Sequence, residues 1–472
     1  MTWPQTRPRW ALAPHPTPGR AGARPADRAL GVDALLAAAF LVDLVTPFLI
    51  WKGVLPDAVR WGSHASLAAM MLLAVAHIMQ QDRVPGVVLA IVILSAIGLA
   101  AGYLRGQGIT ATAWGWWVMF QFPVVGLYAY TRPGWPARWP ETVRRALVIG
   151  LAAVVAVQVG QYLTGETPGD NLAGLFGRHG TANLMLYVAL VVSVGLGLWL
   201  AQGAWRTLAA VLALGMLASV LGEIKMFLPT VFALGLLALG LFSARQRHMG
   251  RLLLYVALLL LVAWLFVVAY DEVVSIPRGT RPLGDYLQLR TLDRYLGTAN
   301  RTIVDGRYVY EIGRNYALIY GWQEIARDPM TLLFGMGLGA RGESRTLGSA
   351  GAGLSEGPLG LSVGTSMLVM MQELGVVGMT LVAGFFLWAL WRLYGDIRRS
   401  PHSELTWMRY ALILFTLLWP VWLWYTTSWT IRVAMLAYWA MLGMVLAAPR
   451  FEAAAERPTV RLTPGEGVRR GR

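Results

Sequence analysis

The sequence predicts an all-α polytopic membrane protein, with about twelve transmembrane helices and a large helical loop on the outer side of the membrane. Of its 472 residues, 56% are hydrophobic and only 14% are charged, and the mean hydropathy is +0.53. Soluble chains carry about 25% charged residues, so this composition excludes an ordinary soluble domain. The chain also contains many apolar runs of roughly 18 residues or more, each long enough to cross a bilayer.

Charge and cysteine content exclude further classes. The formal net charge is +15, but the basic residues lie in short segments between apolar runs. That distribution indicates membrane topology, and no nucleic-acid partner is expected. Because the chain has no cysteine, disulfides, thiolate nucleophiles and cysteine-bound metals are excluded. Residues 1–29 are rich in proline and arginine and lack an apolar stretch, which predicts a disordered cytoplasmic tail and not a cleaved signal.

Twelve apolar segments define the predicted spans. Nine lie within 30–270 and three within 364–448, separated by a loop over 271–363 and followed by a tail over 449–472. The tenth segment is long, and we predict a short re-entrant or tilted piece through Gly375 followed by a full helix. The segments are 30–50, 64–81, 84–104, 111–130, 146–163, 181–201, 204–222, 226–243, 251–270, 364–394, 405–426 and 431–448.

Arginine placement predicts the orientation of these spans. With twelve spans, the arginine-rich segments 1–29, 131–145, 244–250, 395–404 and 449–472 all fall on one face. Positive residues favour the cytoplasmic side, so both termini are expected to be cytoplasmic. The loop 271–363 then lies outside. It holds ten arginines and ten acids, and loops of this length translocate largely regardless of charge.

Two helices are predicted in the long loop. Leu289, Leu292, Leu296, Ala299 and Ile303 follow helical spacing and would form one apolar stripe. A second helix is expected over 311–327, with aromatic side chains suited to the membrane interface.

The first candidate site is a set of outer arginines. Arginine presents a rigid fork of donors that matches phosphate oxygens, so these residues could bind a lipid diphosphate at the membrane surface. The alternative is a solvated helix face whose arginines pair with the ten local acids. The residues are Arg290, Arg294, Arg301, Arg307, Arg314 and Arg327.

Two short outer segments carry the next candidates. Glu223 and Lys225 lie in a brief turn between two spans, where the acid could hold a substrate-binding lysine in place or the lysine could simply reach the interface. Arg178 and His179 follow a glycine before another span. Histidine titrates near neutral pH, so His179 could act as a general base, although a loop histidine is usually only solvated.

The fourth candidate is Glu373, because a carboxylate within an apolar segment is costly and is by default functional or paired. We interpret Asp33 and Asp43, in the first span, as structural. No zinc-protease, Walker or aspartate-rich motif is present, so no cofactor and no metal are expected.

Several motifs, in order over about 165–395, resemble the O-antigen ligase and O-antigen polymerase superfamily of bacterial membrane glycosyltransferases. Leu175 to Gly177 with Asn183 is similar to the family's glycine and asparagine stretch, and Lys225 to its basic residue opening a span. The family's run of an arginine, a tryptophan, a proline and spaced glycines has a similar counterpart in this sequence. The family's element of a glutamate followed by two glycines has one too. These residues are Arg314, Trp322, Pro329, Gly335, Gly337, Gly339, Glu373, Gly375 and Gly378.

The resemblance implies a helical fold like that of lipid-linked-sugar (GT-C) glycosyltransferases in the bacterial inner membrane. It implies transfer of a glycan from undecaprenyl diphosphate at the periplasmic face to a glycan or lipid acceptor, by inversion and without a metal. Arg178, Lys225, Arg290, Arg294 and Arg314 would bind the diphosphate. The acceptor hydroxyl would be positioned by Glu223, Glu373 or His179. Membrane lipids surround the protein in this interpretation.

Other functions stay open on the sequence. Ligases usually carry a histidine just before the glutamate element, but Gly364-Thr365-Ser366-Met367 stands there, which favours a polymerase or a ligase with another base. A ligase would transfer the glycan to lipid A-core or to protein. A polysaccharide transporter or a non-catalytic scaffold are the alternatives from other classes; a transporter would be expected to show two repeated halves.

Overall fold

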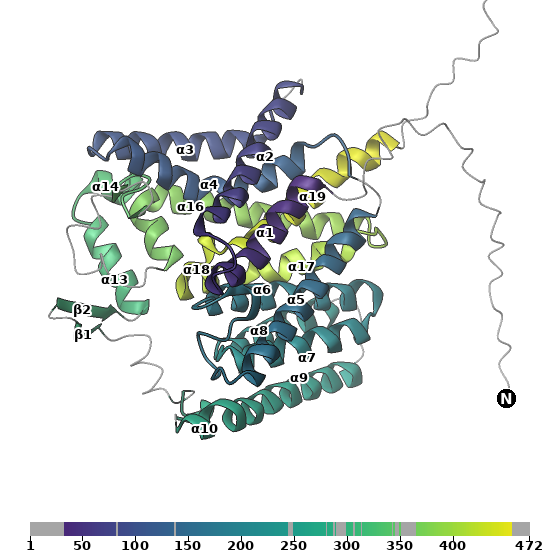
Figure 1. Ribbon diagram of the computed structural model, residues 1–472. Helices are drawn as coiled ribbons and strands as arrows, with labels where there is room; N and C mark the ends of the chain where they lie inside the picture. Colours follow the sequence, from purple (N-terminus) through teal and green to yellow (C-terminus); the bar gives the residue numbers. More distant parts are fainter. Residues whose placement is uncertain are drawn as a thin grey trace, which may run out of the picture.

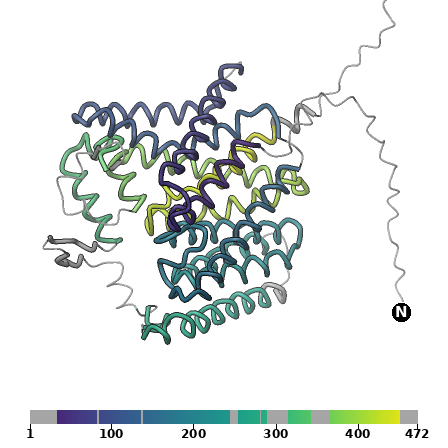
Figure 2. Tube along the Cα trace, viewed as in Figure 1, coloured from purple at the N-terminus to yellow at the C-terminus, as the bar shows by residue number. Residues whose placement is uncertain are grey.

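The computed structural model of the chain is a bundle of helices that run largely side by side (Figures 1 and 2). It describes residues 33–81, 84–135, 138–243, 249–279, 281–286, 288, 299–304, 307–312, 314–341, 343–344, 349–350 and 365–455. The regular structure of these residues is helical apart from two short antiparallel hairpins, β1–β2 and β3–β4.

The long helices of the first part are α1 (Ala34–Trp51), α2 (Trp61–Met79), α3 (Gly86–Leu104), α4 (Ile109–Thr131), α5 (Trp139–Leu163), α6 (Thr181–Gln202), α7 (Trp205–Leu221), α8 (Phe227–Ser243) and α9 (Met249–Tyr270). A π-helical turn over Asp271–Ser275 extends α9 into α10 (Ile276–Arg278), and α11 (Leu283–Tyr286) follows. The later elements are β1 (Ala299–Val304), β2 (Arg307–Ile312), α13 (Arg314–Ile325), α14 (Pro329–Phe334), β3 (Glu343–Ser344), β4 (Ser349–Ala350), α16 (Ser366–Arg399), α17 (Thr406–Leu417), α18 (Trp419–Tyr425) and α19 (Arg432–Ala455).

The predicted multi-pass membrane architecture is confirmed in outline. Among the described residues, eight helices are long and apolar enough to cross a membrane, and α17 with α18 makes a ninth if this pair, bent by 46°, is one span. The helices α7 and α8 are apolar but have only 17 residues each. The described residues therefore provide eight or nine crossings by length and composition, and the count of twelve stays a prediction.

The centre of the bundle is formed by α4, α6, α17 and α19. In the apolar stretches of α6 and α19, 83% and 89% of residues are buried, against 11% in α9 at the lower edge of Figure 1. Glycines let these central helices approach closely. A Cβ on Gly443 of α19 would lie 2.1 Å from the carbonyl oxygen of Gly126, and one on Gly197 of α6 would lie 2.3 Å from that of Trp407.

The segments that connect the helices contact one another at two ends of the bundle. We call the end with the pairs Lys52–Glu166 and Arg105–Asp328 the loop end, and the end with the pair Asp33–Arg132 the terminal end. At the terminal end, Asp33 caps α1 and pairs with Arg132, which follows α4. This contact agrees with a structural role for Asp33.

At the loop end, Lys52 pairs with Glu166 at 3.0 Å and Arg105 pairs with Asp328 at 2.6 Å. Hydrogen bonds from Thr331, together with Arg105, hold the pKa of Asp328 below its usual range. The elements α10, α13, α14 and β1–β2 all lie at this end, on the left of Figure 1.

The predicted interruption at Gly375 is confirmed. Helical geometry continues on both sides, but Gly375 itself has φ +63° and ψ −168°. A glycine-rich segment inserts beside this break, where the N–H of Met336 donates to the carbonyl of Gln372 at 2.7 Å. Gly337 has φ +91°, and a Cβ there would lie 2.1 Å from the backbone nitrogen of Gly102 in α3. The spaced glycines therefore allow a backbone insertion between helices.

Part of the predicted loop structure is wrong. Residues 299–303, assigned to the first loop helix, form strand β1, which pairs with β2 so that Val304 faces Arg307. The sequence between the strands is Asp305-Gly306, a strong hairpin signal between runs of β-branched and aromatic residues, and this signal outweighs the helical spacing. Residues 289–298 lie outside the described part of the chain. The second predicted helix, over 311–327, is confirmed in part: α13 spans Arg314–Ile325, whereas residues 311 and 312 end strand β2.

Candidate functional site

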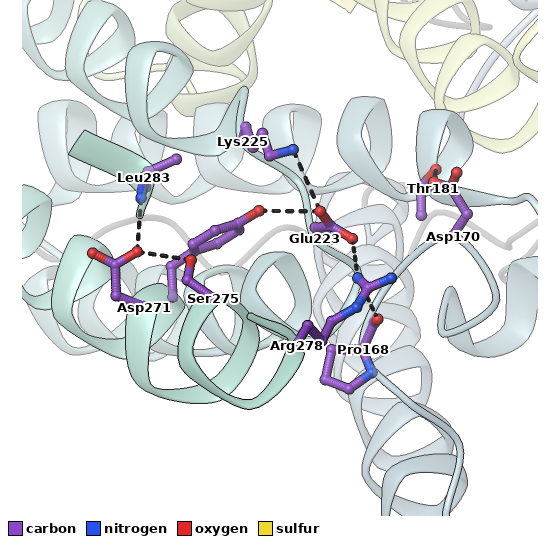
Figure 3. A network of polar contacts seen from close by, with 10 residues as sticks. Pro168, Asp170, Thr181, Glu223, Lys225, Asp271, Ser275, Arg278 and Leu283 are labelled. Atoms are coloured by element: carbon purple, nitrogen blue, oxygen red, sulfur yellow. Dashed lines mark hydrogen bonds and ion pairs between the residues drawn. The ribbon is translucent and has the colours of Figure 1, made fainter. Parts of the chain in front are cut away.

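A polar network at the loop end contains two of the predicted site residues (Figure 3). Glu223 lies in the turn that follows α7, and its carboxylate contacts three groups. Its Oε2 lies 2.5 Å from the Arg278 guanidinium, while its Oε1 lies 3.3 Å from Lys225 Nζ and 3.4 Å from the Tyr270 hydroxyl. We call these four residues the Glu223 cluster. Both carboxylate oxygens are occupied, so Glu223 holds two cations in place.

The connection 164–180 packs against the same turn. The N–H of Gly169 donates to the carbonyl of Leu221 at 3.0 Å, and Arg278 also donates to the carbonyl of Pro168 at 3.0 Å. Asp170 accepts from the His179 backbone and from the Thr181 hydroxyl. The structure thus brings the predicted segments of His179 and Glu223 to one place.

Backbone conformation marks the same two residues. Among the described residues, the non-glycine residues with positive φ are His179, at +60°, and Glu223, at +54°. Residues other than glycine are strained in this region, and such strain is concentrated at functional sites. Arg178 does not join the Glu223 cluster through its guanidinium Nε, which donates to Asn171 at 3.1 Å.

The two cations of the Glu223 cluster are partly exposed, with 29% of the Lys225 side chain and 38% of the Arg278 side chain accessible. Lys225 Nζ also lies 4.3 Å above the centre of the Tyr286 ring. A rigid guanidinium and an ammonium on either side of one carboxylate form a donor set that suits an anion with several oxygens. Arg278 was absent from the sequence-based site, because a single arginine near the start of a long loop has no distinguishing pattern.

An apolar cavity of about 540 Å³ lies between α6, α7, α8 and α9, and the loop ends of the last three carry the Glu223 cluster. Met216, Val231 and Leu265 are among its lining residues. Leu265 lies five residues before Tyr270, which is about 7.5 Å along a helix. The cavity therefore lies further along the helices, toward the terminal end, than the Glu223 cluster.

Arg314 has different neighbours. Its Nε donates to the carbonyl of Tyr425 at 2.7 Å, and its guanidinium lies 4.0 Å from the centre of the Tyr425 ring. The next residue, Asn315, accepts from the Trp424 indole. Arg314 thereby fastens α13 to α18, and in Figure 1 α13 lies well apart from α10. The sequence interpretation required Arg314 and Lys225 to lie together at one site. The contacts of the described residues do not join them.

The remaining predicted arginines are not part of the described site. Arg290 and Arg294 lie outside the described residues. Arg301 lies on strand β1 and Arg307 lies on the other strand of the hairpin, β2.

Glu373 lies just before the break in α16 and is buried. Its carboxylate accepts the backbone N–H of Arg341 at 3.0 Å, and its carbonyl accepts the N–H of Gly337 at 3.2 Å. The adjacent Gln372 donates to Glu324 of α13. These contacts fasten the glycine-rich segment to α16, so Glu373 serves the fold in this structure.

A second charged cluster was missed by sequence reasoning. Arg432, the first residue of α19, donates to Asp43 at 2.7 Å and to the Ser63 hydroxyl at 2.6 Å, and lies 2.9 Å from His64 Nε2. The indole of Trp117 donates to His64 Nδ1 at 2.8 Å. We call these five residues the Arg432 cluster. The signal was Asp43 itself, since an acid within an apolar span calls for a cationic partner.

The chain matches no family model, and no curated protein matches it. Within the part of the chain that the structure describes, no group of three or more His, Asp or Glu side chains could hold a metal ion.

Proposed function

We propose that the protein is a membrane glycosyltransferase of cell-surface polysaccharide assembly, which transfers a glycan from undecaprenyl diphosphate at the periplasmic face of the bacterial inner membrane. The acceptor in this proposal is a growing glycan, as for a polymerase. One observation carries the proposal: Lys225 and Arg278, from separate segments, flank the Glu223 carboxylate at the loop end of an apolar helix bundle.

The two cations suit a diphosphate. Arginine binds phosphate oxygens through two parallel hydrogen bonds, and lysine adds a point charge. When a diphosphate leaves the anomeric carbon it takes the electron pair of the broken C–O bond, and nearby cations stabilise that charge. Because Lys225 and Arg278 are partly exposed, a ligand in the outer solvent or interface can reach them.

The apolar cavity supports a lipid-linked donor. An isoprenoid chain needs an apolar surface next to its charged head group. The cavity between α6 and α9 begins about 7.5 Å along the helix from Tyr270 and has a volume of about 540 Å³. A lipid whose diphosphate is bound at the Glu223 cluster could therefore place its first isoprene units between these helices.

Glu223 is the acid that best fits a role in the reaction. When the diphosphate takes Lys225 and Arg278, the carboxylate of Glu223 is released and can accept the proton of the acceptor hydroxyl. The acceptor oxygen then forms the new bond at the anomeric carbon while the bond to the diphosphate oxygen breaks. Glu373 has its carboxylate on the backbone of the glycine-rich segment, so we assign it no step.

Helix directions agree with the alternation proposed for the first four spans. Near their starts, α2 and α4 are joined by His64 and Trp117, and near their ends His77 stacks on Tyr128. The two helices are thus parallel, as expected for the second and fourth spans. Helix α1 runs opposite to α4, because Asp33 at its start meets Arg132 after the end of α4. Cytoplasmic termini belong to the same proposal.

The test is polymer synthesis in cells that carry Lys225→Ala or Arg278→Ala. For both variants we expect polymer synthesis to fall by about 100-fold, the cost of removing one donor to a developing charge. Polymer length and amount are measured on a gel, with protein level measured by immunoblot. Accumulation of single lipid-linked repeat units indicates a polymerase, and accumulation of long chains that stay on the lipid carrier indicates a ligase.

The matched control is Arg206→Ala. Arg206 also lies over an aromatic ring, that of Trp205, but at the start of α7, at the terminal end of the bundle. Its polymer should be unchanged. Normal polymer from both Lys225→Ala and Arg278→Ala, at normal protein level, would refute the proposed diphosphate site.

A further inference from the structure

Four aromatic rings gather where α2 and α4 begin, next to the Arg432 cluster. The ring centres of Trp61 and His64 are 5.2 Å apart, and those of Trp61 and Trp114 are 6.2 Å apart. His64 also lies 5.8 Å from Trp114 and 6.0 Å from Trp117. We call Trp61, His64, Trp114 and Trp117 the aromatic cluster. The proposed diphosphate site uses none of these residues.

The hydrogen bonds of His64 are in conflict. Its Nδ1 faces the Trp117 indole N–H at 2.8 Å, and its Nε2 faces an Arg432 nitrogen at 2.9 Å. Tryptophan and arginine can only donate, whereas a neutral imidazole accepts at one nitrogen and donates at the other. If Nδ1 accepts from Trp117, the Nε2–H of His64 and an N–H of Arg432 converge. An oxygen atom that accepts from both would satisfy these two donors.

The charges of the Arg432 cluster indicate what kind of oxygen fits. Arg432 is already paired with the buried Asp43, and His64 is close to this guanidinium. A cationic ligand is disfavoured in the aromatic cluster because it offers no acceptor to these two N–H donors, although aromatic rings alone would attract one. The paired Asp43 removes most of the attraction for a multiply charged anion. A neutral hydroxyl group is the acceptor that remains.

We propose that the aromatic cluster and Arg432 form a binding subsite for a neutral sugar ring. The C–H face of a sugar is apolar and packs on aromatic rings, while its hydroxyl oxygens accept from Arg432 and from His64 Nε2–H. Trp61 is 42% exposed and the Arg432 side chain is 27% exposed, so a ring can reach both. The inference deepens the proposed function and rests on it for the role of the sugar, which is part of the transferred or accepting glycan.

An interfacial belt is the competing explanation, because tryptophan is enriched where membranes meet water. A belt accounts for exposed rings such as Trp61. It does not account for the indole of Trp117, which donates inward to a histidine that also meets a paired arginine. The two explanations predict different effects when single rings are removed.

The test is saturation-transfer difference NMR on the full-length protein in nanodiscs. The probe is an equimolar mixture of the methyl glycosides of glucose, galactose, mannose and N-acetylglucosamine. We expect transfer to the ring C–H protons of at least one glycoside. In Trp114→Ala and in His64→Ala the affinity should fall by about tenfold, the upper value for one aromatic contact. Trp114→Phe keeps a ring and should keep most of the binding.

Two controls make the outcome decisive. Trp205→Ala removes an exposed tryptophan from the start of α7, away from the cluster, and should bind as the unchanged protein does. Thermal unfolding of each variant separates loss of binding from loss of folding. The inference is overturned if no glycoside shows transfer, or if binding persists in both Trp114→Ala and His64→Ala. If no sugar binds but Lys225→Ala still abolishes polymer synthesis, the inferred sugar subsite is wrong and the proposed function stands.

Discussion

The Glu223 cluster and the Arg432 cluster lie at the same end of the bundle, yet they are built differently. In the Glu223 cluster, the acid and Lys225 are two residues apart, and Arg278 is 55 positions away. In the Arg432 cluster, Arg432 and Asp43 are 389 positions apart. The side chain of Glu223 is 22% exposed, whereas that of Asp43 is 5% exposed.

This difference separates a partly exposed ion cluster from a buried ion pair. A partly exposed carboxylate can exchange its cations for solvent or for a ligand at small cost, because water screens the charges. A buried carboxylate cannot lose its only cation without a large penalty. We therefore expect charge changes in the Glu223 cluster to affect activity more than stability, and the reverse for the pair of Asp43 and Arg432.

The largest stability effect is expected for Arg432→Ala. The change leaves the buried Asp43 without its cation, which costs about 3 kcal/mol of unfolding free energy. Denaturant or thermal unfolding in detergent measures it. The double variant Asp43→Asn with Arg432→Gln removes both charges and should be less destabilised than Arg432→Ala alone. Equal stability of Arg432→Ala and the unchanged protein would contradict the assignment of a buried pair.

A smaller effect is expected for Glu223→Gln. The amide keeps the shape but loses the charge that attracts Lys225 and Arg278, and partly exposed ion pairs contribute about 1 kcal/mol or less. Polymer synthesis should nevertheless fall strongly, since the proposed proton acceptor is gone. Measuring unfolding and polymer on the same preparations sharpens the comparison: a loss of stability as large as that of Arg432→Ala would show that Glu223 is mainly a structural residue.

The smallest effect is expected for Arg178→Ala. The described contact of its Nε is with Asn171, on the exposed side of the connection 164–180. Surface substitutions of this kind usually change the free energy of unfolding by about 0.5 kcal/mol or less. If polymer synthesis is also unchanged, the proposed diphosphate site consists of Lys225 and Arg278 without Arg178. A loss of polymer at full stability would instead place Arg178 in the site.

Much of the helical framework could be predicted from the sequence, because long apolar runs have few other ways to satisfy their backbone in a membrane. The break at Gly375 and the helix over 314–325 were also within reach. The hairpin β1–β2 was missed although its turn signal was present, because the apolar spacing over the preceding residues also fits a helix. In that stretch a local turn preference prevailed over helical periodicity.

Only part of the candidate site could be predicted from the sequence. Glu223 and Lys225 are close in sequence, so their pairing follows from the short turn alone. The arrival of Arg278 depends on the helical extension of α9 into α10, which carries Arg278 beside the turn of Glu223. Arg314 lies on another element, α13, and contacts Tyr425. Contacts between elements this far apart in the sequence have no spacing rule, since the entropy of loop closure changes slowly with loop length.

By itself, the sequence determined that this chain is a bundle of apolar helices with most of its charges at their ends, because burying unpaired charge in hydrocarbon is too costly. Only the tertiary structure decided which charges meet. Asp43, His64, Trp117 and Arg432 come from four helices, and their meeting depends on which helix faces pack together. That choice is made by side-chain volume and glycine contacts along whole helices, such as Gly126 against Gly443, and not by the four residues themselves.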